Sequence, residues 1–220
     1  MPVKARANIG SYCPKNKRTP VIGHAANNGR SSVIYKFSQN NFLRTIADSL
    51  HYIECEGGEL KHKEFLAESG PDPRRALAER LCADIPMNTC VTAYNKAFEC
   101  TRIRELAALF LDLAEHLLNI RDNIVDLLVP FQSGYYYNRA MGGSFSIKSV
   151  LPAIFPDDPS LDYHNLEGVH NGGEAMDIFP KIEFMPPEEQ AKARHNLLKY
   201  CELDTYAMVK VWQELERVAK

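Results

Sequence analysis

Two segments with helical spacing each carry a carboxylate in an otherwise apolar stripe. In the C-terminal segment, apolar residues recur at steps of three and four, namely Leu197, Cys201, Met208, Val211 and Leu215. The slot between the second and third of these holds Asp204. In an earlier segment, extending the stripe back from Ile103 by four positions reaches Glu99. A carboxylate in a buried stripe is costly unless it is paired or binds a metal, so both acids are candidate metal ligands.

The chemistry that such a pair would support is that of a divalent cation. Mg²⁺ and Mn²⁺ prefer hard oxygen ligands, and phosphoryl chemistry with two metals needs several such ligands to converge. Tyr200 lies one helical turn before Asp204, on nearly the same face. The alternative is that each acid lies at the edge of its stripe, exposed to solvent or paired with a Lys or Arg.

A run of three tyrosines, Tyr135–Tyr137, lies in a loop-like stretch, and Arg139 and Lys148 follow it. Aromatic rings can stack on bases and cations can contact phosphates, so Tyr136 and Lys148 are candidate nucleic-acid-binding residues. The alternative is that the tyrosines are half-buried and serve only packing.

The charge is divided unevenly along the chain, whose formal net charge is −2. Residues 1–48 hold eight Lys or Arg and one acid, a balance of +7, whereas residues 49–220 hold 18 Lys or Arg and 27 acids, a balance of −9. We therefore divide the chain into a basic, irregular head over 1–48 and a domain over 49–220. The head is a nucleic-acid arm, a segment of different origin or a loose tail without function.

Periodicity and turn signals predict the elements that must position these side chains. Strands are expected at 32–37, 49–55, 59–66 and 89–94. Helices are expected at 74–83, as one long helix from 97 to 130, at 146–155 and from 186 to the C-terminus. This order favours an α/β or α+β layer fold with a mixed sheet.

The composition excludes several classes of protein. With 220 residues, of which 45% are hydrophobic and 25% charged, the chain has the composition of a globular protein. No apolar run approaches the ~20 residues that span a membrane, and the start shows no secretory signal. The six cysteines form no C-x-x-C pair and are expected to be reduced. We therefore expect a cytoplasmic protein with no membrane partner.

The motifs around the two acids resemble those of the DEDD superfamily of 3′–5′ exonucleases, in its tyrosine branch. The sequence YCELD at 200–204 is similar to the third motif, Tyr-x-x-x-Asp. The sequence YNKAFE at 94–99 is similar to the second motif, in which Asn and an aromatic residue precede an acid. The stretch from about Ser49 to Val218 also resembles an uncharacterised bacterial family of this ribonuclease-H-like fold. The stretches that carry this resemblance are SLHYIE, DPRRALAERL, YNKAFE, SFSIKSVLP, NGGEAM and YCELDTYAMV.

The resemblance implies an α/β domain of ribonuclease-H-like fold, with a mixed sheet flanked by helices. It implies a phosphodiesterase that acts on nucleic-acid 3′ ends through Mg²⁺ or Mn²⁺. Asp204 and Glu99 would be the metal ligands, Tyr200 would orient the attacking water, and Asn95 would bind substrate. Asp126, an acid between the second and third motifs, is interpreted as a turn residue rather than a ligand. Superfamily members usually carry Asp in place of Glu99, whose extra methylene moves the carboxylate by ~1.5 Å.

The first motif of these enzymes, Asp-x-Glu on the first strand, supplies half of the metal ligands. Residues 1–48 contain no Asp-x-Glu, and their only acid is Asp48. If the strand at 32–37 stood in its place, Lys36 and Ser38 would hold the acid positions, and a Lys there would repel Mg²⁺. We therefore expect an atypical or absent first strand, one weak cation site at most, and impaired or absent activity. The alternatives are a non-catalytic module that binds single-stranded nucleic acid or a protein, and a truncated family member without function.

Overall fold

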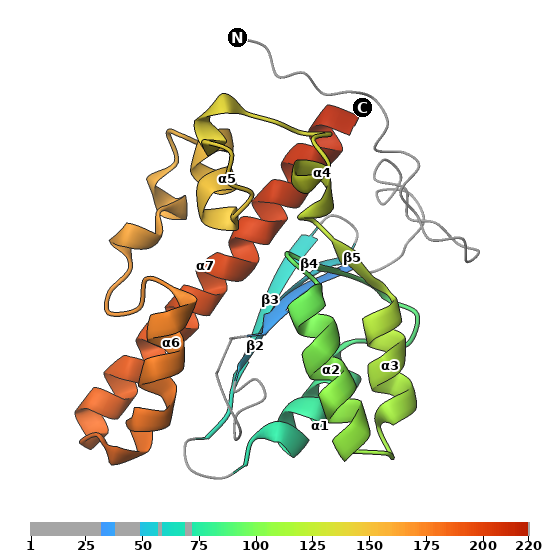
Figure 1. Ribbon diagram of the computed structural model, residues 1–220. Helices are drawn as coiled ribbons and strands as arrows, with labels where there is room; N and C mark the ends of the chain where they lie inside the picture. The colour runs from blue at the N-terminus through green and yellow to red at the C-terminus, as the bar shows by residue number, and fades with distance from the viewer. Residues whose placement is uncertain (1–31, 38–48, 57–58, 69–71, 220) are drawn as a thin grey trace.

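The fold was obtained as a computed structural model, which describes residues 32–37, 49–56, 59–68 and 72–219 (Figure 1). It is a mixed α/β arrangement with helices on both sides of one sheet. The predicted fold class is therefore confirmed at this level. In the part of the chain that is described, no helix is long and apolar enough to cross a membrane.

Among the described residues, five strands form the sheet, in the order β3-β2-β1-β4-β5. Their bounds are β1 Ser32–Phe37, β2 Ser49–Glu56, β3 Glu59–Leu66, β4 Cys90–Ala93 and β5 Ile124–Asp126. Strand β2 runs antiparallel to β1 and β3, whereas β4 runs parallel to β1 and β5. The β2–β3 hairpin and β4 confirm the strands that the sequence predicted there.

Strand β1 lies at the centre of the sheet and confirms the strand predicted at 32–37. Ile34 is level with Ile53 of β2 on one side and with Thr92 of β4 on the other. The sheet therefore includes residues from both sides of the boundary that the charge pattern suggested at residue 48. The other residues of the basic head, 1–31 and 38–48, lie outside the described residues, and Ser38 and Asp48 are among them.

Seven α-helices surround the sheet in the described part of the chain. Their bounds are α1 Arg74–Asp84, α2 Ala97–Leu109, α3 Ala114–Asp122, α4 Val129–Gln132, α5 Ile147–Ile154, α6 Gly172–Ile178 and α7 Pro187–Ala219. Short 3-10 helices span Arg139–Met141, Pro159–Leu161, Tyr163–Asn165 and Phe179–Phe184. Helices α1, α5 and α7 confirm the predicted ones, and α7 has Glu188 and Glu189 in its first turn, where the helix dipole favours them.

The single long helix predicted from 97 to 130 is wrong. Helix α2 ends at Leu109, and Phe110 leaves the helical conformation with φ −122° and ψ 81°. Helix α3 then follows, and β5 adds a strand to the sheet. The stripe misled the prediction because both helices bury their apolar residues in the same core, so spacing of three and four continues across the break.

Two hydrophobic cores lie on opposite sides of the sheet. The first joins α1, α2 and α3 to one face, with buried residues that include Leu77, Leu81, Val91, Ile103 and Leu117. The second lies beneath α7, which contacts β1, β2 and β3 and packs with the segments between 127 and 182. Val91 and Ala93 of β4 belong to the first core, whereas Tyr94, directly after the strand, packs against the second. This alternation places α2 and α7 on different sides of the sheet (Figure 1).

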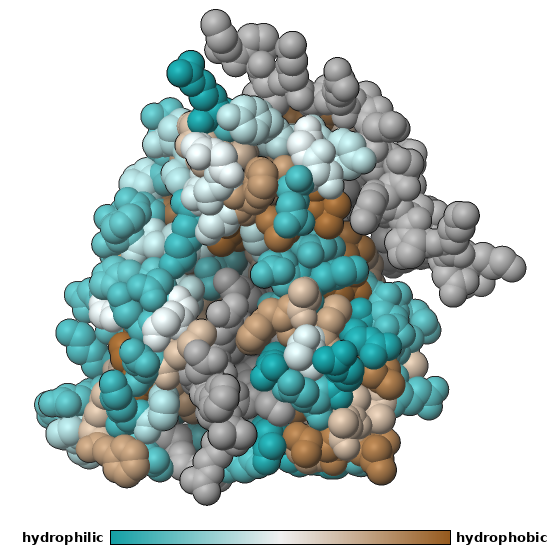
Figure 2. All heavy atoms as spheres, in the orientation of Figure 1, coloured by the Kyte–Doolittle hydropathy of each residue, from teal (hydrophilic) through white to brown (hydrophobic). Residues whose placement is uncertain are grey.

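Hydrophilic residues dominate the face of the molecule that Figure 2 shows, with smaller hydrophobic areas between them. The exposed large apolar side chains in the described part of the chain are Met87, Leu109, Leu111, Tyr137, Phe184 and Tyr206.

Candidate functional site

Asp204 lies in the middle of α7, and its side chain is buried, with 2% exposure. The hydroxyl of Tyr163 donates a hydrogen bond of 2.6 Å to Oδ1 of Asp204. Tyr163 opens the 3-10 helix Tyr163–Asn165, whose first turn is capped when the Asp162 carboxylate accepts from the backbone N–H of His164. Burial and the nearby Asp204 carboxylate raise the pKa of Tyr163, so its phenol stays protonated and remains a donor.

Tyr200 lies one turn before Asp204 on the same helix, as the spacing predicted. Its ring is buried, and its centroid lies 6.0 Å from that of Tyr163. Burial raises the pKa of Tyr200, and the charge and side-chain hydrogen bonding of Asp204 raise it further. The two phenols and the carboxylate therefore form one buried group in which Asp204 is the acceptor.

Lys148 reaches this group from α5. Its ammonium lies 4.9 Å from the ring centroid of Tyr163 and 5.6 Å from that of Tyr200. It also donates a 2.9 Å hydrogen bond to the backbone carbonyl of His170. Cation–π contact with two rings and a carbonyl acceptor hold the lysine head group at the edge of the site. The structure thus brings together Asp204, Tyr200 and Lys148, three of the residues that the sequence singled out.

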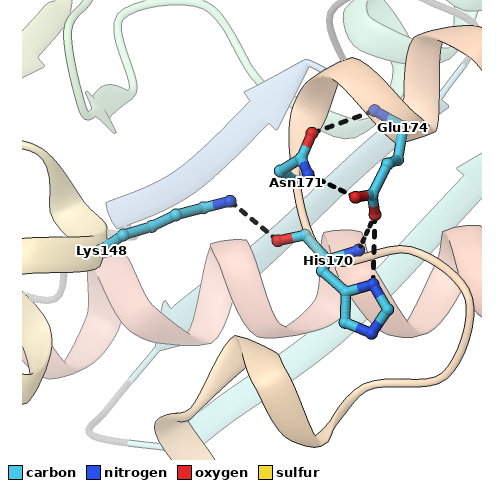
Figure 3. A network of polar contacts seen from close by, with 4 residues as sticks. All are labelled: Lys148, His170, Asn171 and Glu174. Carbon is cyan, nitrogen blue, oxygen red and sulfur yellow. Dashed lines mark hydrogen bonds and ion pairs between the residues drawn. The ribbon is translucent and has the colours of Figure 1, made fainter.

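The turn that carries the His170 carbonyl is tied together by Glu174 (Figure 3). Oε2 of Glu174 accepts from the backbone N–H of His170 at 2.7 Å and lies 3.2 Å from Nδ1 of the same residue. Oε1 of Glu174 accepts from Nδ2 of Asn171 at 2.6 Å, and Oδ1 of Asn171 accepts from the backbone N–H of Glu174 at 3.1 Å. These bonds, led by that from the His170 N–H, lower the pKa of Glu174. Glu174 therefore holds this turn as a charged carboxylate.

Glu99 lies in the first turn of α2 and is also buried, with 2% exposure. It continues the buried stripe of Ile103 and Leu106, on the side of the sheet away from α7. Both acids are therefore core-facing, as the stripes predicted, but they belong to helices from different layers. No group of three or more His, Cys, Asp or Glu side chains that could hold a metal ion occurs among the described residues. A two-cation centre needs several converging carboxylates, so the described donor set does not fit one.

Asn95 stands in the turn between β4 and α2, where its φ is 65°. Asn adopts this left-handed conformation more readily than most residues. Its backbone N–H and that of Lys96 donate to the Asp126 carboxylate at 2.9 and 3.0 Å, and the N–H of Leu128 donates to the same carboxylate at 3.0 Å. Asp126 therefore holds the turn that leads to Glu99, which fits its interpretation as a turn residue.

Tyr94, the residue before this turn, connects it to the segment that enters α5. Its hydroxyl donates to the Phe145 carbonyl at 2.6 Å, and its ring packs 6.3 Å from that of Phe131. This hydrogen bond thus connects the second motif, at 94–99, to Phe145, three residues before Lys148.

Tyr136 is enclosed in the second core, with 2% exposure. Its ring meets that of Phe131 edge-on at 5.3 Å, and its hydroxyl donates to Oε1 of Glu214 at 3.0 Å. A ring packed in this way presents no face to a nucleic-acid base, so the stacking role predicted for Tyr136 does not fit this structure. The neighbouring Tyr137 is 51% exposed.

The sequence did not identify Tyr163, His170 or Asn171 as site residues. Asn171 could have been found, because Asn followed three residues later by Glu is a signal for the start of a helix, and α6 begins at Gly172. Tyr163 carries no such signal, since its partner Asp204 is 41 residues away in the sequence.

Comparison with known proteins places the chain in a family. No curated protein and no solved structure matches it significantly. A family model described as a domain of unknown function, DUF2779, matches residues 36–146, which include Glu99 and Asp126 but precede Lys148 and Asp204. Because this match spans just over half of the 220 residues, the chain belongs to the DUF2779 family.

Proposed function

We propose that this chain is a ribonuclease-H-like domain of the 3′–5′ exonuclease type, which acts on single-stranded nucleic acid with impaired hydrolytic activity. The observation that carries the proposal is the buried group of Tyr163, Tyr200 and Asp204, with Lys148 at its edge. A mixed sheet with helices on both faces, and a final helix that carries the Tyr-x-x-x-Asp motif against it, agree with the resemblance seen in the sequence.

In this proposal each side chain has a role that its contacts support. Asp204 is oriented by the Tyr163 hydroxyl, from which its Oδ1 accepts a hydrogen bond. Tyr200 stays protonated, so its hydroxyl can orient a water molecule beside the phosphodiester. Lys148 contributes positive charge where the phosphate of a bound strand would lie.

The proposal includes impairment because the acids are too few. Asp-x-Glu is missing from residues 1–48, and Asp204 and Glu99 lie on helices from different layers. Carboxylates in separate layers do not converge on two cations, so at most one Mg²⁺ or Mn²⁺ would bind, and weakly. We therefore expect hydrolysis well below that of an enzyme with a complete set of acids.

A degradation assay with Mn²⁺ tests the proposal directly. A single strand labelled at its 5′ end would be incubated with the wild-type chain, with Asp204→Ala, and with Asp157→Ala as an exposed control. We expect slow loss of nucleotides from the 3′ end by the wild-type chain and by the control, and none by Asp204→Ala. Equal rates for the wild-type chain and Asp204→Ala, including no degradation by either, would exclude an exonuclease role for this chain.

The second candidate is a module that binds single-stranded nucleic acid without cleaving it. The specific observation that favours it is that the described residues hold no metal-binding group of acids, whereas the Lys148 ammonium is fixed by the His170 carbonyl. Retention of a labelled strand that weakens steeply with salt, without degradation, would support this role. Absence of both binding and degradation would favour a protein-binding role or a family member without function.

A further inference from the structure

We propose that Lys148 binds a backbone phosphate of the strand at this site, and that Glu174 is the residue that positions it. The inference rests on the proposed function, because it assumes that nucleic acid lies beside Asp204 and Tyr200. It goes further by assigning Lys148 a direct contact with the phosphate and by naming a positioning residue that neither motif contains.

The first argument is the way in which Lys148 is held. A lysine side chain has four rotatable bonds and loses much conformational entropy when it is fixed. Here the ammonium is fixed by the His170 carbonyl at 2.9 Å and by the faces of Tyr163 and Tyr200. A cation that folding has already ordered can bind an anion without a further ordering cost, which is the basis of preorganised binding.

The second argument is electrostatic. Asp204 and Glu174 both place negative charge near Tyr200, because each contributes to raising the pKa of that residue. Without a cation nearby, these carboxylates would repel an approaching phosphate, and the ammonium of Lys148 offsets that repulsion. A lysine ammonium is a compact point charge and a common phosphate ligand in proteins.

The local structure of α5 does not account for a lysine at this place. Lys148 is the second residue of α5, and the helix dipole disfavours a cation in the first turn. Since this position costs helix stability, the contacts made by the ammonium must offset that cost.

Glu174 fixes the carbonyl that orients Lys148 (Figure 3). Its Oε2 accepts from the backbone N–H of His170, and its Oε1 accepts from Asn171, the next residue. The His170 carbonyl, which belongs to the peptide between these two residues, is therefore held from both sides. Loss of the Glu174 carboxylate would release this carbonyl and, with it, the position of the ammonium.

The test measures binding of a fluorescent single-stranded oligonucleotide by anisotropy, without divalent metal and over a series of salt concentrations. The variant is Lys148→Met, and the matched control is Lys210→Met, which removes another lysine that lies over a ring, that of Phe155 at 4.8 Å. We expect Lys148→Met to weaken binding about tenfold, as for loss of a charged hydrogen bond. We also expect the slope of log affinity against log salt to become shallower by about 0.7, the loss of one phosphate contact.

The positioning role of Glu174 is tested in the same assay. Glu174→Ala is expected to weaken binding about threefold, and Asp177→Ala, an exposed acid on the same helix, to leave it unchanged. If Glu174 acts through Lys148, the double variant binds no more weakly than Lys148→Met alone. Additive losses would show that Glu174 does not position Lys148.

The outcomes separate this inference from the function on which it rests. If the wild-type chain does not bind the strand, the proposed function fails and the inference with it. If the wild-type chain binds and Lys148→Met binds equally, or binds more weakly with an unchanged salt slope, Lys148 only connects α5 to the turn and the inference is wrong. Competition by inorganic phosphate or a mononucleotide as strong as that by unlabelled strand would assign the site to a free phosphate ligand.

Discussion

The Tyr163 hydroxyl donates to Oδ1 of Asp204 at 2.6 Å and thereby connects two segments that are 41 residues apart in the sequence. Both side chains are buried, that of Asp204 on α7 and that of Tyr163 in the segment packed against it. A carboxylate that is removed from water depends on such donors, because an unsatisfied buried charge is expensive. This hydrogen bond therefore couples the site to the stability of the second core.

The first prediction concerns this bond. Tyr163→Phe keeps the ring and removes the hydroxyl, so Asp204 loses a donor while the packing remains. We expect the free energy of unfolding to fall by about 1–3 kcal/mol, measured by urea denaturation. Tyr137→Phe is the matched control, since Tyr137 is 51% exposed, and its free energy of unfolding should stay within about 0.5 kcal/mol of the wild-type value. Equal values for the two variants would mean that the bond contributes nothing to stability.

The second prediction concerns the turn before α2. Asp126 accepts three backbone N–H groups, from Asn95, Lys96 and Leu128. Asp126→Ala would leave these donors without their acceptor and should lower the free energy of unfolding by about 2 kcal/mol. The control Asp122→Ala removes an exposed acid at the end of α3 that pairs with the adjacent Arg121. It should change the free energy of unfolding by less than about 0.5 kcal/mol. A small effect of Asp126→Ala would show that the turn does not depend on this carboxylate.

Much of the fold could be predicted because its elements carry local signals. The hairpin of β2 and β3, the central β1, and helices α1, α5 and α7 all follow from alternation, helical spacing or turn residues near their ends. Strand β5 was missed because Ile124–Asp126 is only three residues long, and Ile124 also continues a helical stripe. Such a short segment becomes a strand through pairing with β4, which no local pattern reveals.

The candidate site could be predicted only in part, for a similar reason. Asp204 and Tyr200 were found because an acid in an apolar stripe is a local anomaly, and Lys148 because it follows a run of tyrosines. That Lys148 meets the two rings, and that Tyr163 meets Asp204, depends on how the segments between α4 and α7 fold back on α7. Tyr136 shows the reverse case, since a tyrosine beside basic residues has the same sequence pattern whether it is exposed or packed in a core.

The third prediction is a pH dependence that arises at Glu214. Its carboxylate accepts hydrogen bonds from the Arg217 guanidinium and from the Tyr136 hydroxyl. These contacts, of which that with Arg217 is the largest, lower the pKa of Glu214. A lowered pKa in the folded state means that ionised Glu214 stabilises the fold above its ordinary pKa of about 4.5, and that this contribution is lost as the pH falls through the lowered value. The difference in free energy of unfolding between the wild-type chain and Glu214→Gln should therefore be constant from about pH 6 to 8 and shrink at lower pH.

Urea denaturation at a series of pH values measures that difference. Glu216→Gln is the control, because Glu216 makes no hydrogen bond or ion pair within the part of the chain that the structure describes. The difference in free energy of unfolding between Glu216→Gln and the wild-type chain should not show the decrease at low pH that is expected for Glu214→Gln. A difference for Glu214→Gln that stays constant down to pH 3 would contradict the assignment.

The fourth prediction concerns the contact between α7 and the edge of the sheet. The guanidinium of Arg194 donates from Nη1 to the Ala67 carbonyl at 2.9 Å and from Nη2 to the Leu66 carbonyl at 3.0 Å. These hydrogen bonds connect α7 to the C-terminal end of β3. Arg194→Met keeps a long apolar stem and removes both donors, which should cost about 1–3 kcal/mol in free energy of unfolding. Hydrogen exchange at the β3 amides should also become faster, because the strand would fray from this end. Lys192→Met, which removes a cation that is 70% exposed two residues earlier, should leave both measurements unchanged. An unchanged free energy of unfolding or unchanged exchange in Arg194→Met would show that these two hydrogen bonds do not hold α7 to the sheet.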